Sequence, residues 1–199
     1  MKLPLMRFIA PIIGLAKRRS FLELALEPLL TRYGRHPAIH AWDVCNEPEW
    51  IIDENSDAFR RDHDVVSLAD MRTFVRSCAA YVHRLAPTHR VTLGSARRKW
   101  VPLWTGCDLD LYQFHWYDHF LREEPFPWAP YDELGLDKPC FIGEVPTENT
   151  LFTPQRFIAA AEEGGYSGLL FWSYGARDGA SNFCPTRTPP RPREGPRRS

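Results

Sequence analysis

Ile39-His-Ala-Trp-Asp-Val-Cys-Asn-Glu47-Pro48 and Pro139-Cys-Phe-Ile-Gly-Glu144 are two apolar runs that each end on a glutamate. Both have the length and flanking turn residues of short buried strands. The glutamates are 97 positions apart, and a barrel of about 250 residues has roughly 31 residues in each of its eight strand–helix units. The spacing therefore fits three units. We expect an α/β fold of the (β/α)8 TIM-barrel type, in which both carboxylates face one barrel mouth.

The rest of the chain alternates between helical and strand-like patterns, which is typical of a parallel sheet covered by helices. Ser67 and Asp70 form a capping pattern at the start of the strongest predicted helix. The predicted helices span residues 21–33, 67–85 and 154–163, and the predicted strands span residues 39–45, 90–95, 111–117, 139–145 and 168–174. Five strands in 199 residues indicate a barrel truncated to about its last five βα units.

The predicted domain organisation has three parts. Residues 1–20 are expected to form an irregular N-terminal segment, and residues 21–184 the partial barrel, with a long polar loop at 48–64 over the mouth. Residues 185–199 are rich in proline and arginine and lack large apolar side chains, so a disordered tail is expected there.

Composition limits the partners and the compartment. Lys plus Arg and Asp plus Glu both total 25, so there is no excess of positive charge that would indicate binding to nucleic acid or to an anionic membrane. No run reaches the ~18 apolar residues of a membrane span. The start loosely resembles a secretory signal, but Arg7 and two prolines interrupt it, so no signal peptide is predicted and the compartment stays open. Five cysteines without a C-x-x-C pair predict reduced thiols.

The segment Trp42-Asp-Val-Cys-Asn-Glu-Pro48 resembles the strand-four signature of clan A glycoside hydrolases, particularly the cellulase/mannanase family 5. Four further segments resemble this family in the expected order, namely Tyr33-Gly-Arg-His-Pro37, His115-Trp-Tyr117, Phe141-Ile-Gly-Glu144 and Phe171-Trp172-Ser173. The resemblance extends from about Phe21 to Gly179. The family's arginine at strand two and histidine at strand three have no matching positions in this chain.

The resemblance implies a retaining glycoside hydrolase that cleaves a β-1,4-linked glucan or mannan without a cofactor, with Glu144 as nucleophile and Glu47 as acid/base. Retaining enzymes hold two such carboxyls about 5–5.5 Å apart. Mutual repulsion then raises one pKa, which is expected to keep the proton donor protonated.

The resemblance also assigns residues that bind the oligo- or polysaccharide substrate. Tyr117 would hydrogen-bond the nucleophile, and His115 would line the subsite of the reacting sugar. Asn46 would bind the 2-hydroxyl, while Trp172 would form a platform under the ring. Trp50 has two open interpretations, an outer subsite or a loop anchor, whereas Trp116 and Trp42 are expected to pack in the core.

Three other interpretations were weighed. His115 and His119 have the i, i+4 spacing of zinc ligands, but their segment is predicted as a strand and Trp116 occupies the position of the expected glutamate, so no metal is predicted. The chain could instead be a catalytically inactive truncated glycosidase that binds carbohydrate through Trp172 and Trp50. A half-barrel that self-associates through open sheet edges is the third possibility.

Overall fold

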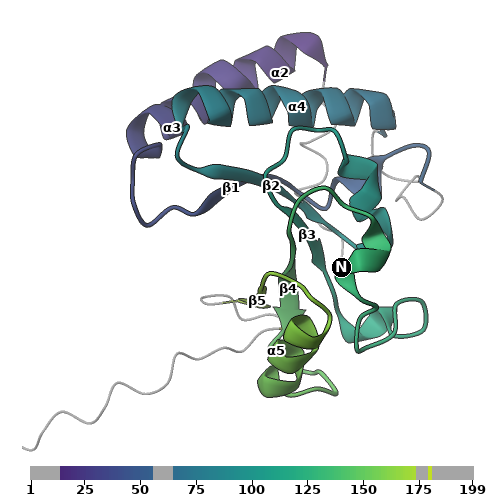
Figure 1. Ribbon diagram of the computed structural model, residues 1–199. Helices are drawn as coiled ribbons and strands as arrows, with labels where there is room; N and C mark the ends of the chain where they lie inside the picture. The colour runs from purple at the N-terminus through teal and green to yellow at the C-terminus, as the bar shows by residue number, and fades with distance from the viewer. Residues whose placement is uncertain (1–13, 56–64, 174–178, 181–199) are drawn as a thin grey trace, which may run out of the picture.

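A computed structural model describes residues 14–55, 65–173 and 179–180. These residues contain one curved sheet of five parallel strands in the order β1-β2-β3-β4-β5 (Figure 1). The strands are β1 (Ala41–Asn46), β2 (Arg90–Ser95), β3 (Tyr112–His115), β4 (Cys140–Pro146) and β5 (Leu169–Trp172). All five predicted strands are confirmed, with shorter bounds at several ends. Sequential order with parallel pairing is that of a TIM-barrel sheet, so the described sheet is a curled half-barrel.

Helices cover the convex side of this sheet. Three consecutive helical segments precede β1, namely α2 (Leu15–Phe21), the π-helical turn η2 (Leu22–Leu26) and α3 (Glu27–Tyr33). The helix α4 (Leu68–Leu85) joins β1 to β2, and α5 (Pro154–Glu163) joins β4 to β5. Figure 1 shows α2 and α4 lying side by side above β1 and β2, with α5 beside β4. The two other connections carry only 3₁₀ turns among the described residues, η4 (Arg98–Trp104), η5 (Asp118–Phe120) and η6 (Tyr131–Leu134).

The first helix corrects the boundary expected at residue 20, because it begins at Leu15. Its basic residues are good helix formers, and Arg19 forms an i, i+4 ion pair with Glu23 at 2.7 Å. Leu22, Leu26 and Leu30 then bury one side of the same helical run. Residues 1–13 and the predicted tail 185–199 lie outside the described residues, as does the stretch 56–64 of the predicted loop.

The core lies between the sheet and the helices that cover it, α4 and α5. Ser67 caps α4 by accepting the amide of Asp70 at 3.0 Å, as its sequence predicts. The buried face of α4 consists of Met71, Phe74, Val75, Cys78, Ala79 and Val82. The four cysteines among the described residues, Cys45, Cys78, Cys107 and Cys140, are buried and free. No helix in the described ranges is long and apolar enough to cross a membrane.

The concave face of the sheet is open and partly polar. It forms a groove of about 1030 Å³, whose lining includes Asp43, Gln113, Glu144, Leu170 and Trp172. A Cβ atom at Gly143 would lie 1.9 Å from Gln113 Oε1, so the glutamine occupies space that only glycine leaves free. The edges of the described sheet are β1 and β5, and self-association through them stays a prediction.

An acidic pair surrounds His83 near the end of α4, at the opposite end of the strands from the two glutamates. His83 Nε2 lies 2.9 Å from Asp110 Oδ2, and His83 Nδ1 lies 3.3 Å from Asp108 Oδ2. Partial burial lowers the pKa of His83, but the hydrogen bond and charge of Asp110 and the charge of Asp108 raise it above its ordinary value overall. The imidazolium therefore links α4 to the segment that leads into β3.

Stability should depend on pH through His83. A raised folded-state pKa contributes stability that is fully present below the unfolded pKa, about 6.5, and is lost as the pH rises through the folded value. We expect His83→Gln to lower the melting temperature more at pH 6 than at pH 9, as measured by circular dichroism. His36→Gln, at an exposed histidine, is the control, and an equal loss at both pH values would contradict the assignment.

Candidate active site

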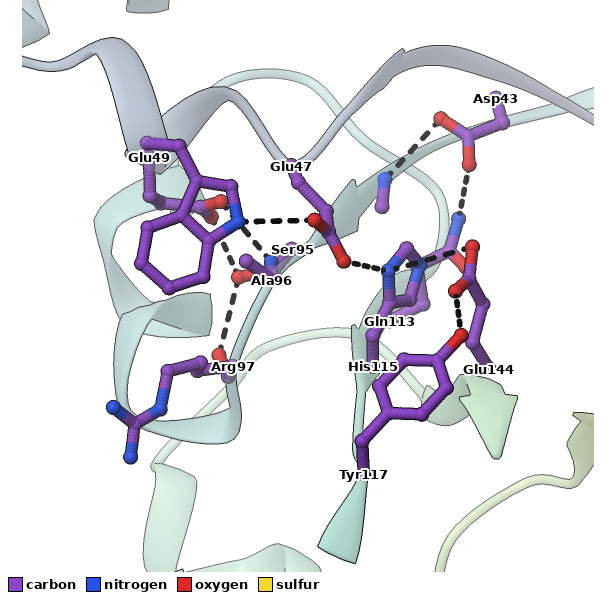
Figure 2. Close-up of polar contacts among 12 residues, drawn as sticks. Asp43, Glu47, Glu49, Ser95, Ala96, Arg97, Gln113, His115, Tyr117 and Glu144 are labelled. Carbon is purple, nitrogen blue, oxygen red and sulfur yellow. Dashed lines mark hydrogen bonds and ion pairs between the residues drawn. The ribbon is translucent and has the colours of Figure 1, made fainter. Parts of the chain in front are cut away.

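Glu47 is held in a defined position directly after β1. Its backbone adopts the left-handed conformation, with φ of 49°, and its amide donates to the carbonyl of Gly94 at 2.6 Å. Glu47 Oε1 lies 2.7 Å from His115 Nδ1, and Glu47 Oε2 accepts the indole N–H of Trp50 at 2.9 Å (Figure 2). A left-handed backbone is uncommon for a residue with a side chain and is concentrated at functional sites. Both carboxylate oxygens thus have fixed partners.

Glu144 approaches Glu47 from β4. Its Oε2 accepts the hydroxyl of Tyr117 at 2.5 Å, and its Oε1 lies 3.6 Å from His115 Nδ1. One oxygen of each glutamate and one ring nitrogen of His115 all lie within 4.8 Å of one another. The structure therefore brings together, from three strands, four residues that the sequence places at strand ends.

Burial and neighbouring charges shift the pKa values of two groups in the site. Burial raises the pKa of the Glu144 carboxyl, whereas the charge of His115 and the Tyr117 hydroxyl lower it and the Glu47 charge adds to the rise. The side chain of Glu144 is 13 % exposed and that of Glu47 is 20 % exposed. Burial lowers the pKa of His115, but the hydrogen bond to Glu47 and the charges of Glu144, Glu47 and Asp43 raise it overall.

The predicted aromatic residues separate into three environments. Trp172, at the end of β5, is 36 % exposed and lines the groove beside Glu144. Trp50 packs edge-on against Trp100 with ring centroids 5.0 Å apart and anchors Glu47, so its loop-anchor interpretation has direct geometric support. Trp116 is fully buried, which confirms its predicted packing role.

Asn46 lies at the last position of β1 and is exposed. Its Oδ1 lies 3.1 Å from the position that a Cβ atom of Gly94 would occupy, and His115 Nε2 lies 3.0 Å from the same point. Asn46 therefore borders the pair of glutamates on the β1 side of the mouth.

Glu49 is a residue that sequence reasoning missed. It is fully buried behind Glu47, where it accepts the Ser95 hydroxyl at 2.6 Å, the Ala96 amide at 3.0 Å and the Trp104 indole at 2.6 Å. Burial raises the pKa of its carboxyl, and these three donors lower it. An acidic residue beside Pro48 carries no sequence signal for burial, but its bonds tie the Glu47 loop to β2 and η4.

Glu49→Ala should destabilise the protein strongly. The change leaves the Ala96 amide and the Trp104 indole without this acceptor, leaves the Ser95 hydroxyl only the Arg97 carbonyl at 3.2 Å, and adds a cavity. We therefore expect a loss of roughly 2–5 kcal/mol in the free energy of unfolding. Urea unfolding followed by tryptophan fluorescence measures this loss. Glu54→Ala is the matched control, because exposed Glu54 accepts only the amide of Leu68 among the bonds described. A loss no larger than that of the control would show that the Glu49 contacts contribute little.

The only set of three or more potential metal donors among the described residues is Glu47, His115 and Glu144. These donor atoms already contact one another, because His115 Nδ1 lies 2.7 Å from Glu47 Oε1 and 3.6 Å from Glu144 Oε1. His119 is not part of this set; its ring stacks on Tyr117 with centroids 5.9 Å apart. We assign no metal to these residues.

Comparison with known proteins identifies relatives of the chain. A mannan endo-1,4-beta-mannosidase of Mytilus edulis is 26 % identical in an alignment that covers 81 % of this chain and 54 % of the relative. A second mannan endo-1,4-beta-mannosidase, from Cryptopygus antarcticus, is 25 % identical and covers 80 % of this chain. The crystal structure of the Mytilus edulis beta-mannanase superposes with a TM-score of 0.67 at 25 % identity, covering 84 % of this chain and 57 % of that structure. The chain is therefore similar to these β-mannanases over most of its own length.

This relationship explains the five-strand sheet as the C-terminal part of a glycosidase barrel. The chain spans about half the length of the curated β-mannanases it matches. The endo-1,4-beta-mannanase of Eisenia fetida gives a TM-score of 0.69 at 22 % identity, which supports the same fold. No family model matches the chain.

Proposed function

We propose that this chain carries the catalytic glutamate pair of a retaining glycoside hydrolase that cleaves β-1,4-linked mannan. The observation that carries the proposal is the approach of one Glu47 oxygen and one Glu144 oxygen to within 4.8 Å. Retaining glycosidases hold their carboxyl groups about 5–5.5 Å apart, whereas inverting enzymes hold them about 6.5–9.5 Å apart to admit a water molecule. The short separation favours direct attack by one carboxylate.

The partners of each glutamate suggest which role it takes. Glu144 accepts a hydrogen bond from Tyr117 and faces His115, which is positively charged when it is protonated. Both contacts favour the ionised form of a carboxylate nucleophile. In the first step Glu144 would bond to the anomeric carbon while Glu47 protonates the departing oxygen. In the second step Glu47 would take a proton from water, which attacks the same carbon and releases Glu144.

The proposed sugar contacts follow the same geometry. Trp172 would support the apolar face of the sugar beside Glu144, because its ring is accessible from the groove. Asn46 would donate to the 2-hydroxyl from the β1 side, a contact that strengthens in the transition state. Mannan is proposed over glucan because the curated relatives are mannan endo-1,4-beta-mannosidases.

The test is the stereochemistry of the first product. The purified chain is mixed with a β-1,4-manno-oligosaccharide, and the new reducing end is followed by proton NMR before it equilibrates. The proposal expects the β-anomer to appear first. Initial release of the α-anomer would overturn the retaining mechanism. Failure to hydrolyse the substrate would overturn the enzymatic function, and saccharide binding without hydrolysis would favour the inactive carbohydrate-binding alternative.

A further inference from the structure

Asp43 is a carboxylate on the concave face of β1, four positions before Glu47. Its Oδ1 accepts the backbone amides of Gly94 and Cys45, each at 3.2 Å, and its Oδ2 accepts the side-chain amide of Gln113 at 2.8 Å (Figure 2). All three partners donate to Asp43. Burial raises the pKa of the Asp43 carboxyl, whereas these three hydrogen bonds and the charge of His115 favour its ionised form. In that form Asp43 places a negative charge in the wall of the groove.

This charge faces the ring of His115 across a glycine. A Cβ atom at Gly94 would lie 3.0 Å from His115 Nε2 and 3.1 Å from each of Asp43 Oδ2 and Asn46 Oδ1. The three atoms therefore approach the same point on β2, where the absence of a side chain leaves space for them. Because Nδ1 of the same ring faces Glu47 and Glu144, the imidazole has carboxylates on both of its nitrogen sides.

We propose that Asp43 is a positioning residue that holds His115 as an imidazolium between the two glutamates. Both ring nitrogens of an imidazolium carry hydrogen, so Nδ1–H would donate to Glu47 while Nε2–H would lie on the side of Asp43 Oδ2 and Asn46 Oδ1. The charged groups that face the ring are Asp43 and Glu47 from β1 and its end, and Glu144 from β4. Tyr117 acts through its bond to Glu144, and β2 contributes only Gly94 at this point.

The arrangement has a consequence for the proposed reaction. Burial raises the pKa of Glu144, which opposes the charged nucleophile that a retaining mechanism requires. A fixed cation 3.6 Å from Glu144 Oε1 counteracts this effect.

Nitrogen-15 NMR of histidine-labelled protein tests the charge of His115 directly, without a substrate. In the wild-type chain we expect His115 to carry hydrogen on both ring nitrogens at pH 7. Asp43→Asn should lower the pKa of His115 by at least about one unit and leave His83 unchanged. A neutral His115 at pH 7 in the wild-type chain, a measurement that needs no variant, would overturn the proposal, as would a His115 pKa unchanged by the substitution.

Asp110→Asn is the matched control. Like Asp43, Asp110 accepts a backbone amide of β2, that of Val91 at 2.9 Å, but its imidazole partner is His83. The control should lower the pKa of His83 and leave that of His115 unchanged. A fall in the His115 pKa of equal size in both variants would overturn the specific role of Asp43.

The catalytic consequence rests on the proposed function and has a separate readout. In Asp43→Asn the acidic limb of the kcat/KM profile should move to lower pH, because the Asp43 charge raises the pKa of Glu144 and His115 stays protonated in the acidic range. Movement to higher pH, or an unchanged limb, would overturn this consequence. Absence of turnover in the wild-type chain would refute the proposed function, while the NMR titration would still decide the charge of His115.

Discussion

Glu144→Gln is expected to reduce hydrolysis of β-1,4-mannan by at least about 10⁴-fold, on the scale of losing a covalent nucleophile. Glutamine preserves the shape of the side chain and an acceptor for Tyr117, so the loss comes from the missing carboxylate charge. The measurement is kcat/KM on a soluble manno-oligosaccharide, with thermal unfolding to verify the fold. Glu133→Gln, at an exposed glutamate on η6, should keep full activity.

A second variant separates a nucleophile from a residue that only positions the substrate. Glu144→Ala with added azide should yield the α-glycosyl azide, because azide then attacks the anomeric carbon from the side that Glu144 vacates. Substantial activity in Glu144→Gln, or a β-glycosyl azide from Glu144→Ala, would refute the assignment of Glu144 as the nucleophile.

Glu47→Ala is expected to lower hydrolysis of mannan by about 10²–10⁴-fold, the usual contribution of general acid–base catalysis. The loss should be much smaller in the first step for aryl glycosides with acidic phenol leaving groups, since these depart without a proton. The alkaline limb of the pH profile should disappear together with the proton donor. Steady-state kinetics on a series of aryl β-mannosides measures both effects.

Azide again provides the decisive control for Glu47. It should restore turnover of the activated aryl substrate in Glu47→Ala and give the β-glycosyl azide, because the glycosyl intermediate on Glu144 still forms. Trp50→Phe is a companion variant that removes the 2.9 Å hydrogen bond to Glu47 Oε2 and replaces the indole that packs against Trp100 by a smaller ring. An equal rate loss for all aryl leaving groups in Glu47→Ala would show that Glu47 does not protonate the leaving group.

Local sequence patterns specify the strands and much of the site, because strand periodicity acts over a few neighbouring residues. The end of β1 places Glu47 at the mouth, and β4 presents Glu144 there as its apolar run predicts. The two-residue spacing of His115 and Tyr117 puts both on one side of the chain, and both contact the glutamates. The start of the first helix was predicted less well, because the basic residues in its first turns carry no apolar periodicity.

The contacts that no local pattern encodes join residues far apart in the chain. Glu49 meets Trp104 across 55 positions, and Asp43 meets Gln113 across 70. Trp50 is close in sequence to its partner Glu47. Whether it lines an outer subsite or anchors the loop depends on the direction of its indole in the 3₁₀ turn η3 (Pro48–Ile51). These contacts depend on the strand register and on the curvature of the sheet.

The sequence by itself determined the α/β architecture, the five strands and the two glutamates at their ends, because strand periodicity, turn residues and strand-end placement are local properties of the chain. Only the tertiary structure decided that His115 lies between both glutamates with Asp43 behind it, and that burial acts on Glu144. The physical reason is that distances between side chains on different strands, and the desolvation that sets their charges, arise only when the sheet curves and brings those strands together.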